Sequence, residues 1–178
     1  MSWEPAFLQG LQELFASPLG RMLSVFCARY AVFLFFPGIV WIWLVSGSLR
    51  EKQLMKEVLW GALIALTVAL LAAHAFGRVR PYNAAPQIVE LRIPAPTTAN
   101  AFPSAHTSTA FALATGIAFA MPEYGIAAYL LAALVGFGRM AAGVHYPTDI
   151  VAGWLVTAAW VGIVCVILRS IRQRKAAQ

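Results

Sequence analysis

Five long apolar stretches dominate the sequence, and they constrain the fold more than any other feature. They run approximately over residues 22–45, 58–76, 105–121, 124–137 and 150–168. A transmembrane helix needs about 20 predominantly apolar residues, within a range of about 17–25. The chain is 61% hydrophobic and only 11% charged, whereas a soluble domain carries about 25% charged residues. The sequence therefore predicts an all-α, polytopic transmembrane helix bundle with five spans, formed by a single domain over residues 1–178.

A further helix is expected before the first of these stretches. Apolar residues recur there at helical spacing, at Phe7, Leu8, Leu11, Leu14 and Phe15, while Gln9, Gln12 and Glu13 take the other face. This pattern is typical of an amphipathic helix lying in the membrane interface, so residues 1–21 are expected to form an interfacial helix. No basic segment precedes the apolar residues, as it would in a signal peptide.

Basic residues are concentrated in two places, and they orient the chain in the membrane. One group comprises Arg50, Lys52 and Lys56, and the other comprises Arg169, Arg172, Arg174 and Lys175. Segments rich in Lys and Arg face the cytoplasm, so five spans place the N-terminus outside and the C-terminus inside. The net charge of +6 then reflects topology, and the short tail without aromatic residues does not indicate nucleic-acid binding. The expected location is the plasma (inner) membrane, as a multi-pass protein.

Three polar clusters fall on the outer face of this arrangement, toward the periplasm or the outside of the cell. They are Arg78 with Arg80, then Ser104, Ala105 and His106, and finally Arg139, His145 and Asp149. Each cluster lies at the end of an apolar stretch. Residues 77–104 are rich in proline, which excludes a regular helix or a central strand. This segment is expected to be an outer loop that carries part of a functional site.

Each cluster taken alone has a purely structural explanation. Arginines at the ends of spans anchor helices at the lipid headgroups. Ser104 suits the N-cap of a helix, and Asp149 suits the first turn of its own helix. His74, one turn inside the second stretch, is expected to be a polar residue with a satisfied hydrogen bond.

A bound phosphate group explains the three clusters together. The arginines would neutralise its oxygens, and Ser104 with the backbone N–H groups near Ala105 would orient it at the positive end of a helix dipole. Asp149 would accept a hydrogen bond from one nitrogen of His145, which leaves the other nitrogen as a nucleophile. His106 would protonate a leaving group. No spacing typical of metal ligands occurs, so no metal and no cofactor is expected.

In order and spacing, these residues resemble the motifs of the type 2 phosphatidic acid phosphatases, the superfamily that also contains the vanadium haloperoxidases. Arg80-Pro81 resembles the end of the first motif, a lysine followed seven residues later by Arg-Pro. Pro103-Ser104-Ala105-His106 resembles the second motif, Pro-Ser-Gly-His. Gly138-Arg139, with His145 and Asp149 downstream, resembles the third, Ser-Arg with a histidine and an aspartate. Three motifs in order at matching spacings are a strong signal.

The chain departs from the family pattern at three positions. Ala105 and Gly138 replace a glycine and a serine, and Ala73 stands where the family has its lysine. Arg78 or His74 is a candidate to supply the missing charge.

The resemblance implies a role for each matching residue. His145 would be the nucleophile and form a phosphohistidine, Asp149 would orient it, and His106 would be the general acid and then activate water. The phosphoryl oxygens would be held by Arg80, Arg139 and Ser104. No metal would be needed.

The small size, the number of spans and the outer site are similar to those of bacterial undecaprenyl-diphosphate phosphatases, which act in cell-wall synthesis. The resemblance implies that the substrate is undecaprenyl diphosphate, which loses its terminal phosphate. Other family members act on phosphatidylglycerol phosphate, phosphatidic acid or lipid A, and a lipid phosphotransferase is an alternative activity. A non-enzymatic lipid-binding or transport protein is a further alternative. The expected partners are the lipid substrate and membrane lipids, and the sequence makes no prediction of oligomeric state.

Overall fold

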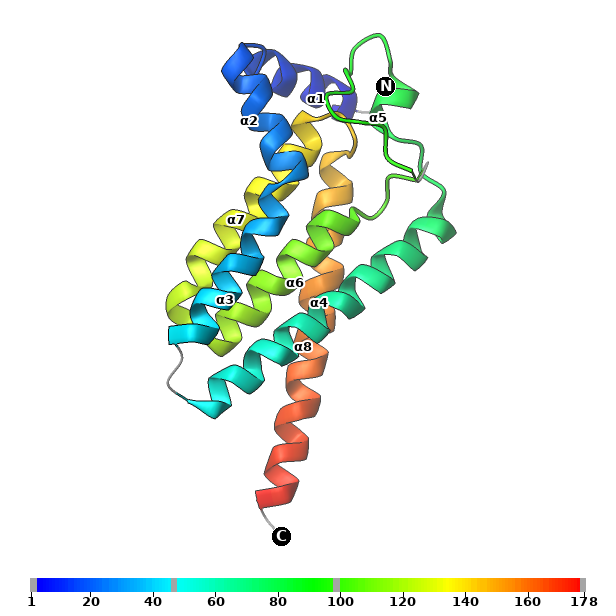
Figure 1. The fold of residues 1–178 in the computed structure, drawn as a ribbon. Coiled ribbons are helices and arrows are strands. Elements are labelled where there is room, and N and C mark those ends of the chain that lie inside the picture. The colour runs from blue at the N-terminus through cyan, green and yellow to red at the C-terminus, as the bar shows by residue number, and fades with distance from the viewer. Residues whose placement is uncertain (1–2, 46–47, 98–99, 177–178) are drawn as a thin grey trace.

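The computed structural model describes residues 3–45, 48–97 and 100–176, and the side chains of these residues except 50, 51, 162 and 164–176. Its helices are α1 (Trp3–Leu14), α2 (Pro18–Arg29), the 3-10 helix η1 (Ala31–Leu34), α3 (Phe35–Val45), α4 (Leu49–Phe76), α5 (Pro81–Ala84), α6 (Ala105–Ala120), α7 (Pro122–Ala141) and α8 (Pro147–Ala176). The only extended pairing among the described residues is one isolated bridge between Val79 and Asn100. The predicted all-α fold is confirmed (Figure 1).

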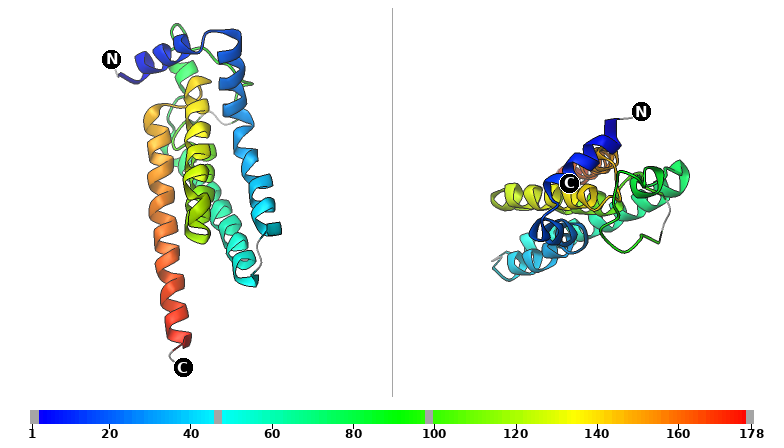
Figure 2. Two further views of the ribbon diagram at one scale, coloured as in Figure 1. Left: turned by 90° about the vertical axis from the view of Figure 1, so that its left-hand side faces the viewer. Right: turned by 90° about the horizontal axis from the view of Figure 1, so that it is seen from above.

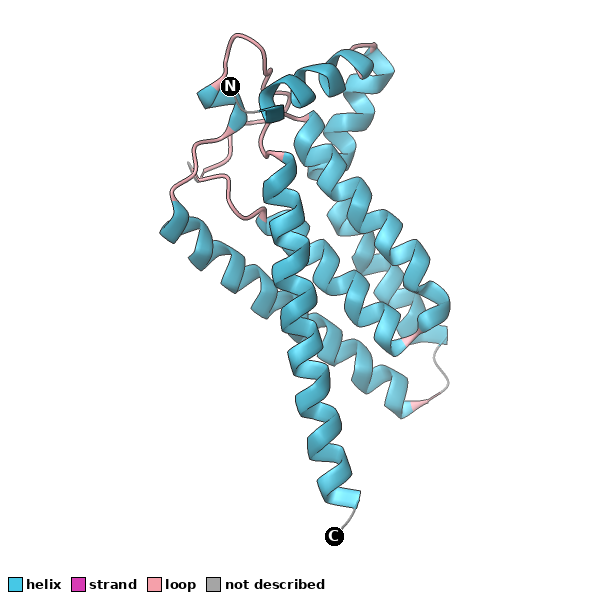
Figure 3. Ribbon diagram, turned by 180° about the vertical axis from the view of Figure 1, so that it is seen from behind, coloured by secondary structure: helices cyan, strands magenta, loops and turns pink. Residues whose placement is uncertain are grey.

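Helix α6 lies at the centre of the bundle, in contact with α4, α7 and α8, while α2 packs along α7 (Figure 3). Small residues line these contacts, and alanines of α6 and α7 such as Ala110, Ala114 and Ala132 are completely buried. A Cβ atom on Gly116 would lie 2.8 Å from the Val58 side chain of α4. Close approach of helix backbones at small residues is the usual basis of helix packing in membranes.

Helix α1 lies crosswise over one end of the bundle (Figure 2), and its buried stripe differs from the predicted one. The buried residues are Glu4, Leu8 and Gln12, whereas Phe7 and Leu14 are exposed. Gln12 was expected on the polar, outward face. It is buried because its side-chain amide donates to the carbonyls of Glu90 (2.7 Å) and Ala141 (3.1 Å) and accepts from the Glu90 N–H (2.9 Å).

The first apolar stretch is bent, which corrects the prediction of a continuous segment over 22–45 and of an interfacial helix over 1–21. Ser17 caps a new helix by accepting a hydrogen bond from the Gly20 N–H (3.1 Å), so α2 begins at Pro18. The helix then breaks at Tyr30, and the segments on either side of the break form an angle of 59°.

The described helices give two or three membrane spans by length and composition, where the sequence predicts five. Lys52–Phe76 and Pro122–Ala141 qualify, and the bent pair of α2 with η1 and α3 makes a third. Helix α6 has 16 residues and is therefore about 24 Å long, which is less than the roughly 30 Å of a hydrocarbon core. The side chains of the basic C-terminal residues, used to orient the chain, lie outside the described side chains.

One end of the bundle, called the polar end below, carries α1, α5, the described parts of the connection 77–104 and the first turns of α6 and α8 (Figure 1). The start of α4, the α6–α7 turn and the end of α8 lie toward the opposite end. All three predicted polar clusters therefore meet at the polar end. The side of the membrane that this end faces stays a prediction.

Candidate active site

A cavity of about 360 Å³ opens at the polar end, between α4, α6 and the connection 77–104. Its walls are formed by Arg29, Leu70, Ala73, Arg80, Ile93, Pro94, Pro96, Thr97, Asn100, Pro103, Ala105, His106, Arg139 and His145. This set contains three arginines and two histidines, and no carboxylate is among the described residues that line it. Such a lining favours a strongly anionic ligand.

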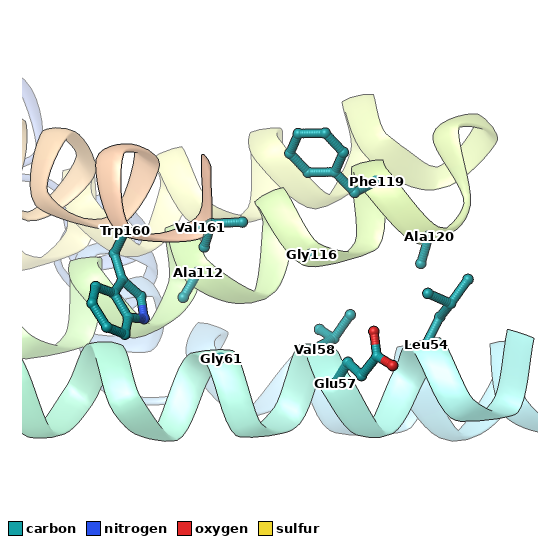
Figure 4. Close-up of a pocket in the computed structure, with 10 residues that line it drawn as sticks. All are labelled: Leu54, Glu57, Val58, Gly61, Ala112, Gly116, Phe119, Ala120, Trp160 and Val161. Atoms are coloured by element: carbon teal, nitrogen blue, oxygen red, sulfur yellow. The ribbon is translucent and has the colours of Figure 1, made fainter. Parts of the chain in front are cut away.

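A smaller, apolar cavity of about 100 Å³ lies nearer the opposite end, between α4, α6 and α8 (Figure 4). Its only ionisable lining residue among those described is Glu57, and none of the predicted site residues lines it. The candidate site is therefore the cavity at the polar end.

His145 is held in one tautomer by two contacts. Its Nδ1 lies 2.7 Å from the carbonyl oxygen of Ala101 and can only donate there, while its Nε2 lies 3.3 Å from Nη1 of Arg80 and can only accept. Burial, reinforced by the charges of Arg139 and Arg80, holds the pKa of His145 well below its usual range. The ring is therefore neutral near pH 7 and turns a lone pair toward a guanidinium.

Arg80 is the residue before α5 and is buried, with 4% of its surface exposed. Its Nη1 also donates to the Val144 carbonyl (2.9 Å). The turn that carries Val144 and His145 depends on Gly143, which has a positive φ of 76° and has no room for a Cβ beside the Glu90 carbonyl. Burial lowers the pKa of Arg80, but an arginine keeps its charge at neutral pH.

Asp149 does not accept a hydrogen bond from His145, which corrects the predicted pairing. Its Oδ2 is 3.6 Å from Nδ1 of His145 and accepts instead from the Tyr146 N–H (2.8 Å), as a cap of its own helix. Its Oδ1 is paired with Arg78. The Ala101 carbonyl takes the role that was expected of Asp149, although the carboxylate is near enough to attract a protonated or phosphorylated ring.

The start of α6 supplies Ala105 and His106 to the cavity, but not the Ser104 side chain. Ser104 is fully buried as the N-cap of α6, where its hydroxyl accepts from the N–H (3.4 Å) and the hydroxyl (3.0 Å) of Thr107. The geometry therefore supports the role of Ser104 as the N-cap of α6, and it does not support a contact of its side chain with a bound phosphate. His106 lines the cavity without a hydrogen-bond partner among the described residues.

Arg139 reaches the cavity from the last turn of α7 and is 5% exposed. Its Nη1 donates to the Ala28 carbonyl of α2 (3.1 Å), and its buried Nε has no hydrogen-bond partner in the described part of the chain. A buried donor without a partner is costly, and an anion in the cavity would satisfy it.

Arg78 and His74, the candidates to replace the missing lysine, do not line the cavity. Arg78 lies beside it, with Nη2 2.6 Å from a Glu4 oxygen, Nη1 on Asp149, and its guanidinium 4.1 Å above the Tyr146 ring. His74 is exposed, and its Nδ1 lies 2.8 Å from the Leu70 carbonyl of the preceding turn. The Arg78 prediction is corrected because two carboxylates already neutralise its charge.

Three residues of this region were not predicted from the sequence. Glu4 binds Arg78 and accepts from the Thr148 hydroxyl (2.7 Å), Ala101 binds His145 through its backbone, and Arg29 lines the cavity. The acidic Glu4 among apolar residues of α1 is the available signal, because a carboxylate that becomes buried needs a cationic partner. A backbone carbonyl gives no signal in a sequence.

The model of the PAP2 superfamily matches residues 54–173. This is well over half of the chain. The chain belongs to the PAP2 superfamily. It is therefore a membrane protein of a lipid phosphatase family, and the matched region contains all three motif clusters.

Among its curated relatives is the undecaprenyl-diphosphatase BcrC of Bacillus subtilis, 29% identical over 140 residues, with 79% of this chain and 70% of the relative covered. A lipid A 1-phosphatase of Rhizobium johnstonii is 30% identical over 170 residues, with 84% of this chain and 66% of the relative covered. The crystal structure of LpxE from Aquifex aeolicus has a TM-score of 0.71 over 93% of this chain and 96% of that one, at 22% identity. The last comparison confirms the fold.

No group of three or more His, Cys, Asp or Glu side chains that could hold a metal occurs in the described parts of the chain. Independence from metals stays a prediction. The single domain over 1–178 also stays a prediction.

Proposed function

We propose that this PAP2 protein hydrolyses the terminal phosphate of a lipid diphosphate, with undecaprenyl diphosphate as the substrate and undecaprenyl phosphate as the product. The observation that carries the proposal is the placement of His145, whose Nε2 faces Nη1 of Arg80 (3.3 Å) in a cavity that the buried guanidinium group of Arg139 also lines. A nucleophile beside two fixed cations suits an anionic, electrophilic phosphorus atom.

In the first step, the Nε2 lone pair of His145 forms a bond to the terminal phosphorus, and the bond from phosphorus to the bridging oxygen breaks. His106 donates a proton to that oxygen, which leaves on undecaprenyl phosphate. The negative charge of a bound diphosphate favours the protonated form of His106 before this step. Arg80 and Arg139 hold the oxygens that gain charge.

In the second step, neutral His106 takes a proton from a water molecule whose oxygen attacks the phosphorus of the phosphohistidine. The phosphorus–nitrogen bond breaks, inorganic phosphate leaves, and His145 regains its lone pair. The attraction of the Asp149 carboxylate, 3.6 Å from Nδ1, supports the ring while it carries positive charge. This cycle uses no metal and no cofactor.

Relatives named for undecaprenyl diphosphate and relatives named for lipid A occur at similar identity, so the choice of substrate rests on the cavity. A cavity with three arginines suits a diphosphate better than a single phosphate ester. We also propose that the polar end faces the periplasm or the outside of the cell, as the positive-inside rule predicts.

Phosphate release from a panel of lipids tests this proposal. Purified protein in detergent with excess EDTA is expected to release phosphate from undecaprenyl diphosphate faster than from lipid A 1-phosphate, phosphatidylglycerol phosphate or phosphatidic acid. His145→Ala should abolish release from every lipid. Faster phosphate release from lipid A 1-phosphate would contradict undecaprenyl diphosphate as the preferred substrate. Transfer of phosphate to an added lipid in place of water would indicate a phosphotransferase. Loss of activity in EDTA would contradict the metal-independent mechanism.

A further inference from the structure

Among the described residues that line the cavity, Arg29 is the one arginine that none of the three sequence motifs contains. It is the last residue of α2 and lines the cavity together with Arg80 and Arg139. Its guanidinium lies 5.4 Å from the centre of the Tyr30 ring. No carboxylate forms an ion pair with it among the described residues, in contrast to Arg78, Arg21 and Arg92. Its charge is available to a ligand.

Two contacts fix the end of α2 at the cavity. A Cβ on Gly138 would overlap with the backbone of Cys27 and Ala28, so the absence of a side chain at Gly138 lets α2 approach α7 closely. The Ala28 carbonyl accepts a hydrogen bond from Arg139 (3.1 Å). Arg29 is the next residue along the chain, and it lines the same cavity as Arg139, which is expected to hold the reacting phosphoryl group.

The cationic groups differ in depth within the cavity. Arg80, Arg139 and His145 are 3–5% exposed, whereas Arg29 is exposed. The buried groups therefore form the inner part of the cavity and Arg29 lies at its mouth. A ligand whose reacting phosphorus meets His145 would place the next group of its chain toward that mouth.

We propose that Arg29 binds the second, non-transferred phosphate of a diphosphate substrate and so selects diphosphates over monophosphates. This inference rests on the proposed function. A planar guanidinium can give two parallel hydrogen bonds to one phosphate, and the inner residues already neutralise the terminal one. Substrates with a single phosphate have no charge at the position of Arg29.

The test compares hydrolysis of farnesyl diphosphate and farnesyl monophosphate, because they share one lipid tail and differ in the second phosphate. Arg29→Gln is expected to raise the KM for the diphosphate about threefold to tenfold, as for the loss of a charge-assisted hydrogen bond that is partly screened by water. The KM for the monophosphate should stay unchanged. Arg29→Glu should enlarge the loss for the diphosphate alone.

Arg21→Gln is the matched control. Arg21 lies on the same helix, and its substitution changes the net charge equally, but its guanidinium is paired with Glu90 (2.7 Å) and does not line this cavity. Both substrates should keep their wild-type KM in this variant.

An equal effect of Arg29→Gln on the two substrates, or no effect on either, would overturn the inference and leave the proposed function intact. Failure of the wild-type protein to hydrolyse farnesyl diphosphate would contradict the proposed function itself. Unchanged monophosphate hydrolysis by Arg29→Gln also reports that this variant is folded.

Discussion

Individual side chains at the polar end take their roles from the groups that they contact. Asp149 is fully buried between the Tyr146 N–H and the Arg78 guanidinium, and Arg78 in turn contacts Glu4. This chain of charges joins α1, the connection after α4 and the first turn of α8. The network stabilises the wall behind His145, whereas the proton on Nδ1 of His145 is held by the Ala101 carbonyl.

Substitution of Arg78 and Asp149, singly and together, should show whether their ion pair contributes to the stability of the fold. Arg78→Gln and Asp149→Asn are each expected to lower the melting temperature in detergent. The first leaves the buried Asp149 carboxylate without its cation, and the second removes one of the two carboxylates that pair with Arg78. The double variant should lose less than the sum of the two, with a coupling energy of about 1–3 kcal/mol. If the losses of stability in the two single variants simply add in the double variant, the Arg78–Asp149 ion pair contributes nothing to stability.

The crossing of α2 and α7 sets the position of two of the cavity's arginines. Gly138 lies against the backbone of Cys27 and Ala28, and Arg139 binds the carbonyl at the same crossing. The family serine at position 138 would not fit here without moving α2. The departure from the motif is therefore a packing requirement of this chain.

Gly138→Ala should push α2 away from α7. We expect a destabilisation of about 1–3 kcal/mol, the usual cost of overpacking, together with a large loss of phosphatase activity as Arg29 and Arg139 move. Gly61→Ala is the control, since it is also helical and a Cβ there meets nothing within 4 Å. If Gly138→Ala and Gly61→Ala had the same melting temperature and the same activity, the α2–α7 crossing would not set the positions of Arg29 and Arg139.

The whole molecule shows which parts of the fold a sequence can predict. Long apolar stretches predict helices, because a chain inside lipid must satisfy its backbone hydrogen bonds internally. The positions of polar residues relative to the ends of these stretches predict which of them lie at the same end of the bundle. The bend at Tyr30 and the short α6 depend on contacts between helices, so periodicity does not reveal them. The burial of Glu4 depends likewise on Arg78, more than seventy positions away in the sequence.

Orientation in the membrane can be tested with single cysteines in intact cells, after Cys27→Ser and Cys165→Ser. Ile88→Cys, in the connection at the polar end, and Leu49→Cys, at the start of α4, both replace exposed side chains. A membrane-impermeant maleimide added outside should label the first and not the second. The reverse pattern would place the site in the cytoplasm.

The phosphoenzyme is the species that distinguishes this account from other phosphatase mechanisms. A lipid diphosphate radiolabelled in its terminal phosphate, mixed with protein and rapidly quenched in alkali, should leave an acid-labile label on His145. His106→Gln should still form this adduct, more slowly, and His145→Gln should form none. A label on another residue, or full activity of His145→Gln without any adduct, would contradict the central claim that His145 attacks the phosphorus.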